Sequence, residues 1–459
     1  MKQWKLKTLA AVLMSAAVVP AYAVNWFQLQ GNEAPGAPAY KIWGFAQPTY
    51  TWIKGTPVTG LLGAASAYNG QVMLNNRVGP DLDKSEQAQL LRARLGVRGV
   101  MPGTDEKINY FVLAEVGDNG TTYNRNLTDR GVSYSEPIVL TDASMTFNYI
   151  PGARIRAGLM RLPMGEEAMQ AVQVMDYINF TNATDVLLNE RFLRYDAAGT
   201  QANAPLPTGS VLQRAMLIGP TGAFRDVGVQ VYDWFNKGRW EYAYALMASQ
   251  GNGLEWTNGS GSGDLTGRLQ ASYVFEGRGL KRQDITFFMW EQDGERSFNN
   301  QTVDRMRRGL GFKFVRGPWR VGAEYIDARG MIWGQPAPQF TDLTSATLHP
   351  VQTVGLNSTA EGYYIDVGWR LNKQWEFDWR YDELDRFTDS KPDQRNQKTY
   401  TYGVQYFYNP KLRFALNYER RDGYAPYLSS IQPAAQQSNV SQIGHSLDDR
   451  VTLQATWLF

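Results

Sequence analysis

Apolar and polar side chains alternate with a period of two residues in short segments that recur from residue 40 to the end of the chain. In residues 91–98 the two sets separate completely, with Leu91, Ala93, Leu95 and Val97 on one face and Arg92, Arg94, Gly96 and Arg98 on the other. This period is typical of β-strands whose two faces meet different surroundings, and the helical period is nearly absent. The pattern therefore predicts an all-β protein.

Sixteen such segments can be distinguished along the chain. They lie near residues 40–54, 88–100, 106–117, 138–150, 153–162, 224–235, 239–249, 266–276, 283–292, 306–316, 319–329, 361–371, 375–385, 398–409, 411–421 and 450–459. The connections between them alternate strictly in length. Short turns fall at 102–103, 151–152, 236–238, 276–282, 317–318, 372–374 and 409–410, and long polar segments at 55–87, 118–137, 163–223, 250–265, 293–305, 330–360, 386–397 and 422–449.

This alternation predicts a transmembrane antiparallel β-barrel of 16 strands at residues 40–459, with short periplasmic turns and long extracellular loops. Strands of roughly ten tilted residues also match the thickness of a membrane. A soluble β-sandwich has no reason to keep every second connection short. Trp240, Trp319, Trp375 and Trp457 each lie near a predicted periplasmic end, where an aromatic girdle is expected. Apolar faces should therefore meet lipid, and charged faces should line the lumen.

The first 23 residues have the features of a cleaved secretory signal peptide. Lys2, Lys5 and Lys7 precede an apolar stretch that ends before Ala21-Tyr22-Ala23, a small-x-small cleavage site. A membrane-spanning helix is the alternative, but the apolar stretch is short for one. Export would leave an N-terminal periplasmic segment at 24–39 and place the barrel in the bacterial outer membrane.

Composition narrows the chemistry. The leader carries three of the 46 basic residues, so the remainder has 43 against 44 acidic residues and no charge that favours nucleic acid. The absence of cysteine excludes disulfides, iron–sulfur clusters and thiolate metal sites. The two histidines, His349 and His445, fall in predicted loops, so we expect no catalytic residues, no metal and no cofactor. An acidic group at Asp382, Glu383, Asp385 and Asp389 leaves two alternatives open, a Ca²⁺ site and a solvated loop.

The last strand ends the chain on an aromatic residue. Trp457 and Phe459 belong to an alternating apolar face that begins at Val451. A terminal aromatic on such a strand resembles the signal by which the barrel-assembly machinery recognises its clients. This strand should pair with the first, since unpaired backbone in lipid costs several kcal/mol per group.

Three stretches resemble the phosphate-selective porin O and P family. They are GLMRLPMGEE at 158–167, RDVGVQVYDWF at 225–235 and RWEYAYALMASQGNG at 239–253. The resemblance implies a 16-stranded homotrimer whose third long loop folds inward as a constriction. It further implies a channel for small ions and solutes.

The 61-residue segment 163–223 is the candidate constriction loop, because a loop of this length with apolar content is usually functional. An extracellular lid is the alternative. Its charged residues of interest are Glu166, Glu167, Asp176, Asp185, Glu190, Arg191 and Arg194. The residues expected to line the pore opposite it are Arg92, Arg94, Arg98, Arg154, Arg156, Arg268, Arg307, Lys313, Arg320, Arg370, Arg380 and Arg413.

Two selectivities remain open at this point. A row of arginines offers weak successive sites for anions such as phosphate. The acidic excess of the loop departs from what a phosphate channel needs, and an arginine wall facing it would instead produce a transverse field, as in general-diffusion porins. We expect passive diffusion of small hydrophilic solutes, with outer-membrane lipid and lipopolysaccharide around the barrel. The alternative is a barrel that acts as a scaffold or sheath for a partner protein; an outer-membrane enzyme fits least.

Overall fold

The computed structural model describes residues 25–29, 31–63, 66, 69–70, 72, 85–117, 119, 125–128, 131–134, 138–195, 208–217, 222–254, 263–277, 282–334 and 351–459. The predicted signal peptide, residues 1–23, lies outside the described residues. Most of the described chain is β-strand, and none of its helices is long and apolar enough to cross a membrane.

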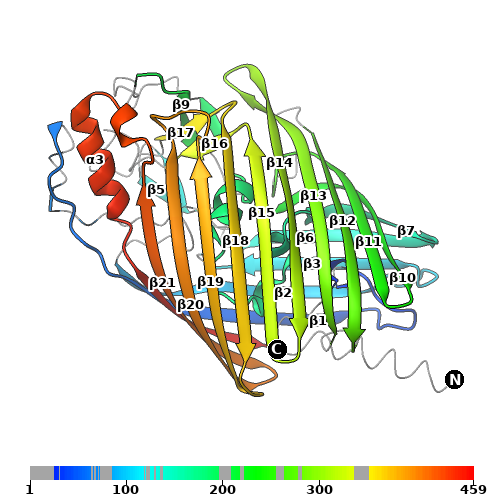
Figure 1. The fold of residues 1–459 in the computed structure, drawn as a ribbon. Coiled ribbons are helices and arrows are strands. Elements are labelled where there is room, and N and C mark those ends of the chain that lie inside the picture. Colours follow the sequence, from blue (N-terminus) through cyan, green and yellow to red (C-terminus); the bar gives the residue numbers. More distant parts are fainter. Residues whose placement is uncertain are drawn as a thin grey trace.

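Sixteen antiparallel strands form one closed barrel, as predicted (Figure 1). In sheet order they are β1 (Lys41–Ile53), β2 (Glu86–Val100), β3 (Ile108–Val116), β6 (Val139–Ile150), β7 (Ala153–Arg161), β10 (Arg225–Lys237), β11 (Trp240–Ser249), β12 (Asp264–Glu276), β13 (Gln283–Phe298), β14 (Gln301–Arg316), β15 (Trp319–Arg329), β18 (Thr359–Arg370), β19 (Trp375–Arg386), β20 (Arg395–Asn409), β21 (Leu412–Tyr424) and β22 (Arg450–Leu458).

The first and last strands close the barrel. β1 pairs with β22, and the backbone groups of Gly44 and Phe459 exchange two hydrogen bonds of 3.2 and 3.0 Å. Neither strand is therefore left with a free edge, which is the condition for a sheet in lipid. The rings of Trp457 and Phe459 lie beside each other at this seam, tilted by 51°, with centroids 5.4 Å apart.

The distribution of side chains is inverted relative to a soluble protein. Large apolar side chains in mid-strand, such as Leu269, Met289 and Leu310, are about 60% exposed on the outer face. Arginines on the opposite face of the same strands are buried inside the barrel. Trp240, Trp319, Trp375 and Trp457 are all exposed on the outside near the short turns, where the girdle was predicted. This inversion is the expected arrangement for a barrel surrounded by lipid.

One predicted face was partly wrong. Leu91 was assigned to the outer face, but it is 1% exposed and packs inside the barrel against Ile178 and Ala415. The pairing of β1 with β2 shifts register between Gln47 and Pro48, which leaves Leu91 as the extra residue of a β-bulge. Proline has no backbone N–H to donate to a neighbouring strand, so a bulge at this point accommodates it in the sheet.

One predicted loop was also wrong. Residues 293–305 form the tip of the hairpin β13–β14, which projects above its neighbours (Figure 1). Asn299 and Asn300 connect the two strands, with φ angles of 50° and 59°. Asparagine tolerates this left-handed backbone, so two residues are enough for the turn.

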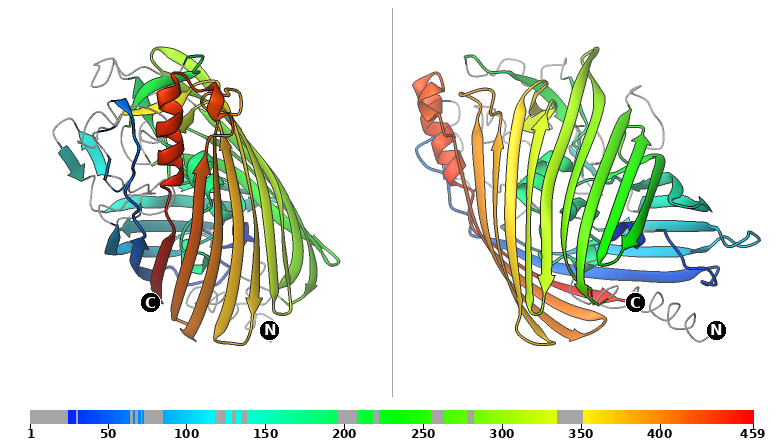
Figure 2. Two further views of the ribbon diagram at one scale, coloured as in Figure 1. Left: turned by 60° about the vertical axis from the view of Figure 1, so that its left-hand side comes forward. Right: turned by 45° about the vertical axis from the view of Figure 1, so that its right-hand side comes forward.

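Short elements in the long loops cover the outer end (Figures 1 and 2). β8 (Leu193–Tyr195) and β9 (Leu212–Leu217) from the third loop join β16 (Ile332–Gly334) and β17 (Val351–Gly355) in a separate sheet. β4 (Arg125–Thr128) pairs with β5 (Gly131–Tyr134). The 3-10 turn η6 (Leu428–Ser430) and the helix α3 (Ala434–His445), neither predicted, precede β22.

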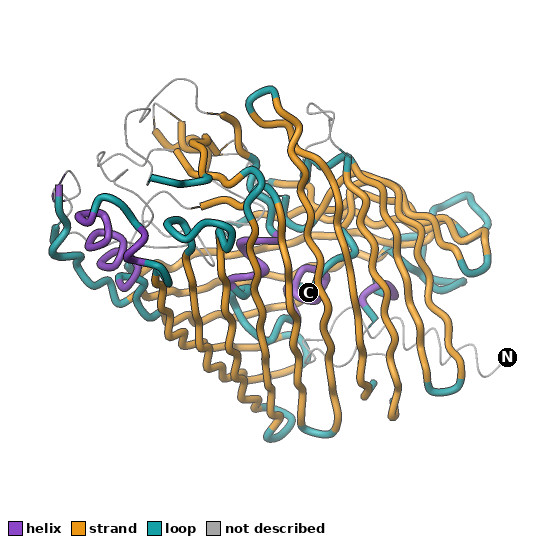
Figure 3. Tube along the Cα trace, turned by 45° about the horizontal axis from the view of Figure 1, so that its top comes forward, coloured by secondary structure: helices purple, strands orange, loops and turns teal. Residues whose placement is uncertain are grey.

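The remaining helical turns lie inside the barrel, enclosed by its strands (Figure 3). They are η1 (Trp26–Gln28) near the N-terminus and α2 (Glu166–Met169), η3 (Val172–Val174) and η4 (Thr184–Leu188) of the third loop.

Substitution of an outer-face residue tests the inversion. We expect Leu269→Arg to lower the free energy of unfolding by about 2–4 kcal/mol, because it places a charge near the middle of the apolar band. Unfolding by urea in lipid vesicles measures the change. The control, Ala435→Arg on the exposed face of α3, should stay within about 0.5 kcal/mol of the unsubstituted chain. Equal losses in both variants would show that Leu269 does not face lipid.

Candidate functional site

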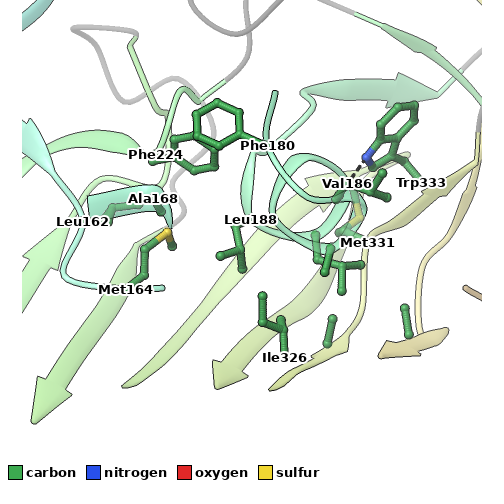
Figure 4. Packing of buried hydrophobic residues seen from close by; sticks show 14 of the residues in the cluster. Leu162, Met164, Ala168, Phe180, Val186, Leu188, Phe224, Ile326, Met331 and Trp333 are labelled. Atoms are coloured by element: carbon green, nitrogen blue, oxygen red, sulfur yellow. Dashed lines mark hydrogen bonds between the residues drawn. The ribbon is translucent and has the colours of Figure 1, made fainter. Parts of the chain in front are cut away.

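Residues 162–192, the first half of the third loop, contact the inner wall of the barrel; we refer to them as the inner segment. Its apolar residues Leu162, Met164, Phe180 and Leu188 are buried and belong to one cluster with Ile326 of β15. Met331 and Trp333, beyond β15, complete it, and the Trp333 indole N–H donates to the Val186 carbonyl at 3.0 Å (Figure 4). This packing gives the segment a fixed position against one side of the wall.

Arginines of the wall hold the backbone of the inner segment. Five of them donate to its carbonyl oxygens at 2.6–3.1 Å. These pairs are Arg268 with Met164, Arg307 with Leu187, Arg380 with Asn179, Arg413 with Met175, and Arg161 with Ala168. All five arginines are buried. Guanidinium suits this task because its five N–H groups can satisfy a carbonyl and a carboxylate together.

Acidic side chains of the inner segment pair with the same wall. Glu166 accepts from Arg268 of β12 and Lys313 of β14, each at 2.8 Å. Glu167 accepts from Arg380 of β19 at 2.9 Å, and Asp176 lies 3.3 Å from the Arg320 guanidinium of β15. The arginines and acids expected to face each other across water are therefore in direct contact on this side.

The other predicted loop residues lie near the C-terminal end of the inner segment. Glu190 accepts from Arg296 of β13 at 2.5 Å, and Asp185 lies 3.4 Å from Arg191 of the same loop. The Arg191 guanidinium also covers the Trp333 ring, at 5.2 Å from its centroid. The side chain of Arg194 lies outside the described part of the structure.

The remaining predicted pore residues also face inward. Arg94 pairs with Glu115 of β3, and Arg154 with Asp233 of β10. Arg98 pairs with Glu33 of the N-terminal segment. Arg370 pairs with Glu376 at 3.0 Å and donates to two carbonyls of the turn after β18. Arg92 lies over the Phe180 ring, and Arg156 donates to the Ser144 hydroxyl at 2.9 Å.

One stretch of wall carries more positive than negative charge. We define the basic wall as β2, β3, β6, β7 and β10, which are consecutive in the barrel. Its inward arginines are Arg92, Arg94, Arg98, Arg154, Arg156, Arg161 and Arg225, and its inward carboxylates are Glu115, Asp142, Asp226 and Asp233. Arg92 and Arg156 pair with no carboxylate of the described residues. The basic wall is therefore a net positive surface.

A small cavity lies between the inner segment and strands β14, β15, β18 and β19 of the wall. It is lined by Glu166, Glu167, Gln170, Asp176, Tyr177, Lys313, Arg320, Tyr364, Asp366 and Arg380, among others, and its volume is about 40 Å³. A volume of that size holds only a few water molecules. Four carboxylates and three cationic groups share it, so its charges nearly balance.

Two carboxylates of this cavity have shifted pKa values. Burial raises the pKa of Asp176 to about 6, although Arg320 opposes the shift. Burial would also raise the pKa of Glu166, but the charges of Lys313 and Arg268 outweigh it and lower that pKa to about 2. Asp176 therefore changes charge just below neutral pH.

Some residues of the site were not predicted. Arg296 and Arg305, which both contact Glu190, were missed because they lie in the residues assigned to a loop at 293–305. Arg161 was missed because it lies at the end of its strand, at an odd spacing from Arg154 and Arg156. A period of two residues would place it on the opposite face. The acidic group at Asp382 to Asp389 is not one site, because Asp382 points inward to Asn182 while Glu383 bonds Tyr363 on the outside.

Part of the chain is similar to a known family of porins. Residues 289–425 match the model of the family described as Phosphate-selective porin O and P. The predicted resemblance is thus confirmed, although the matched residues lie beyond the three stretches that suggested it. No curated protein matches the chain in sequence.

Several solved structures resemble the chain at low identity. OmpF of Salmonella typhi, in complex with daunomycin, is 11% identical with a TM-score of 0.50, covering 92% of this chain and 97% of that one. The anion-selective porin of Comamonas acidovorans is 10% identical, with a TM-score of 0.49 and coverages of 92% and 100%. The channel DcaP of Acinetobacter baumannii is 12% identical, with a TM-score of 0.48 and coverages of 94% and 100%.

The arginine anchors can be tested at Arg380. We expect Arg380→Ala to lower the free energy of unfolding by about 3–5 kcal/mol, because it leaves the Glu167 carboxylate buried without its partner. It should also speed proteolytic cleavage of the inner segment in the folded barrel. Urea unfolding and limited proteolysis measure the two effects.

The outward pair Arg308–Asp327 provides a matched control, because its N–O distance of 2.8 Å resembles the 2.9 Å of Arg380–Glu167. The Arg308 side chain is 59% exposed, so Arg308→Ala should cost only about 0–1 kcal/mol. A similar cost for both variants would contradict the anchoring role of Arg380.

Proposed function

We propose that this outer-membrane porin admits small hydrophilic solutes by passive diffusion, with a modest preference for anions, along the basic wall. The inverted barrel supports passive diffusion of hydrophilic solutes, because a charged lumen enclosed by an apolar surface offers a polar route through lipid. The net charge of the basic wall supports the preference for anions. Positive groups along a narrow passage raise the local concentration of anions.

The inner segment serves as the constriction in this proposal. Its acidic side chains pair with cationic groups of β12, β14, β15 and β19, so the uncompensated positive charge lies on the basic wall. The cavity on the opposite side supports only weak selectivity, since its charges nearly balance and most are in contact. We therefore favour a channel for small anions in general over a dedicated phosphate channel.

Assembly belongs to the same proposal. The chain forms a homotrimer within outer-membrane lipid and lipopolysaccharide, after export with its leader removed. The barrel-assembly machinery recognises the terminal strand through Trp457 and Phe459. Chemical cross-linking of intact outer membranes should give a trimer band, and a monomer band alone would contradict the trimer.

The selectivity is tested by removing two arginines of the basic wall. We expect Arg92→Ala combined with Arg156→Ala to lower the anion-to-cation permeability ratio roughly twofold or more, because both charges lack a carboxylate partner. Reversal potentials across planar bilayers in a KCl gradient measure the ratio. Arg308→Ala, which removes a charge from the outer face, is the control and should leave it unchanged. An unaltered reversal potential in the double variant would contradict the preference for anions, and absence of conductance steps in folded wild-type protein would contradict the channel itself.

The pKa of Asp176 predicts a dependence on pH. Below pH 6 its carboxyl becomes neutral, so the lumen loses a negative charge and the anion-to-cation permeability ratio should rise between pH 7.5 and pH 5. Reversal potentials at the two pH values provide the measurement. Asp176→Asn should show the higher ratio at both values, and an undiminished pH response in that variant would assign the effect to another group.

A further inference from the structure

Residues 25–29 and 31–33 lie inside the barrel near the end that carries the short turns; we refer to them as the N-terminal segment. Trp26 and Phe27 are 2% and 4% exposed. They form a cluster with Tyr232 of β10, with Ala243 and Ala245 of β11, and with Met169 of the inner segment. The strand residues of this cluster are on the inward face of the barrel. Two aromatic side chains thus occupy the lumen itself.

Polar contacts attach the N-terminal segment to strands β2 and β11 of the wall. The amides of Asn25 and Gln28 donate to the two oxygens of Glu241 at 3.1 and 2.9 Å. Arg98 of β2 pairs with Glu33 and donates to the carbonyls of Leu29 and Asn32, each at 2.9 Å. These contacts join β2 to β11, so the segment lies along the inner face of the strands between them.

Close backbone packing adds to this attachment. Gly31 has a φ angle of +65°, and a methyl group built on it would lie 3.2 Å from the Arg156 guanidinium. A residue with a side chain would strain both the backbone and this contact. The segment is therefore shaped to the basic wall.

The N-terminal segment also contacts the inner segment directly. The Trp26 indole N–H donates to Glu166 at 2.7 Å, and the Lys313 ammonium lies 5.2 Å from the centre of the Trp26 ring. Glu166 is the carboxylate that Arg268 and Lys313 hold at the cavity. The two segments are therefore consecutive obstacles along the same passage.

We propose that the N-terminal segment is a resident plug that narrows the periplasmic half of the pore and sets the upper size of solutes. The proposal rests on the passive-channel function. Trp26 and Phe27 occupy part of the lumen beside β10, β11 and the inner segment, and contacts to Glu241 and Arg98 hold the N-terminal segment there. Because these anchors are side-chain contacts rather than a strand ladder, the plug can be removed without breaking the barrel.

The position of the plug can be measured independently of transport. The chain contains no cysteine, so Phe27→Cys and Pro35→Cys each introduce a single thiol. In the folded barrel a maleimide-polyethylene glycol reagent should modify Pro35→Cys, at an exposed position, much faster than Phe27→Cys. Equal rates would overturn the proposal, whatever the channel conducts.

The effect of the plug on transport is measured with Trp26→Ala combined with Phe27→Ala. This variant should raise single-channel conductance about twofold or more and should admit larger sugars in liposome swelling, because the lumen loses two aromatic side chains. Trp240→Ala, which removes a tryptophan from the outer face, is the control and should match wild type. A protected thiol with unchanged conductance and size limit would overturn the plug. If the folded wild-type protein itself shows no conductance steps, the channel function has failed. The size-limiting role then fails with it. The wild-type recording therefore distinguishes this case from failure of the plug alone.

Discussion

A strand that crosses lipid must pair on both edges, and the rest of this structure follows from that constraint. Sixteen strands satisfy it by closing on themselves, with Gly44 and Phe459 joined at the seam. Closure leaves each strand one face for lipid and one for the interior. The apolar set is needed outside, so the charged set is enclosed. The enclosed charges then require partners.

Some of those partners are on nearby strands, and others come from chain that enters the barrel. Arg268, Arg307, Arg380 and Arg413 each contact a backbone carbonyl of the inner segment. A buried ion pair is not by itself a source of stability, because desolvation offsets the attraction, but removing one partner leaves a costly charge. The network therefore specifies one position for the segment more than it strengthens the barrel. The proposed constriction needs that property, since its dimensions must stay constant.

Pairing also decides how much charge a solute can meet. Around the cavity beside Asp176 the cations and carboxylates are in contact, and their fields largely cancel. Along the basic wall the arginines exceed the carboxylates, and Arg92 rests on an aromatic ring rather than on an acid. A weak preference for anions and a small size limit are consistent with this distribution. The plug formed by Trp26 and Phe27 lies in series with it.

By itself the sequence determined the strands, the closed barrel and the inward direction of the arginines, because a period of two residues is a local property of the backbone. It also predicted the loop at 163–223. Only the tertiary structure decided what each inward side chain meets, since Arg380 and Glu167 are 213 residues apart and alternation carries no information at that separation. The bulge at Leu91 and the return of Trp26 into the lumen were hidden for the same reason. Both depend on space left by distant strands, which no local pattern records.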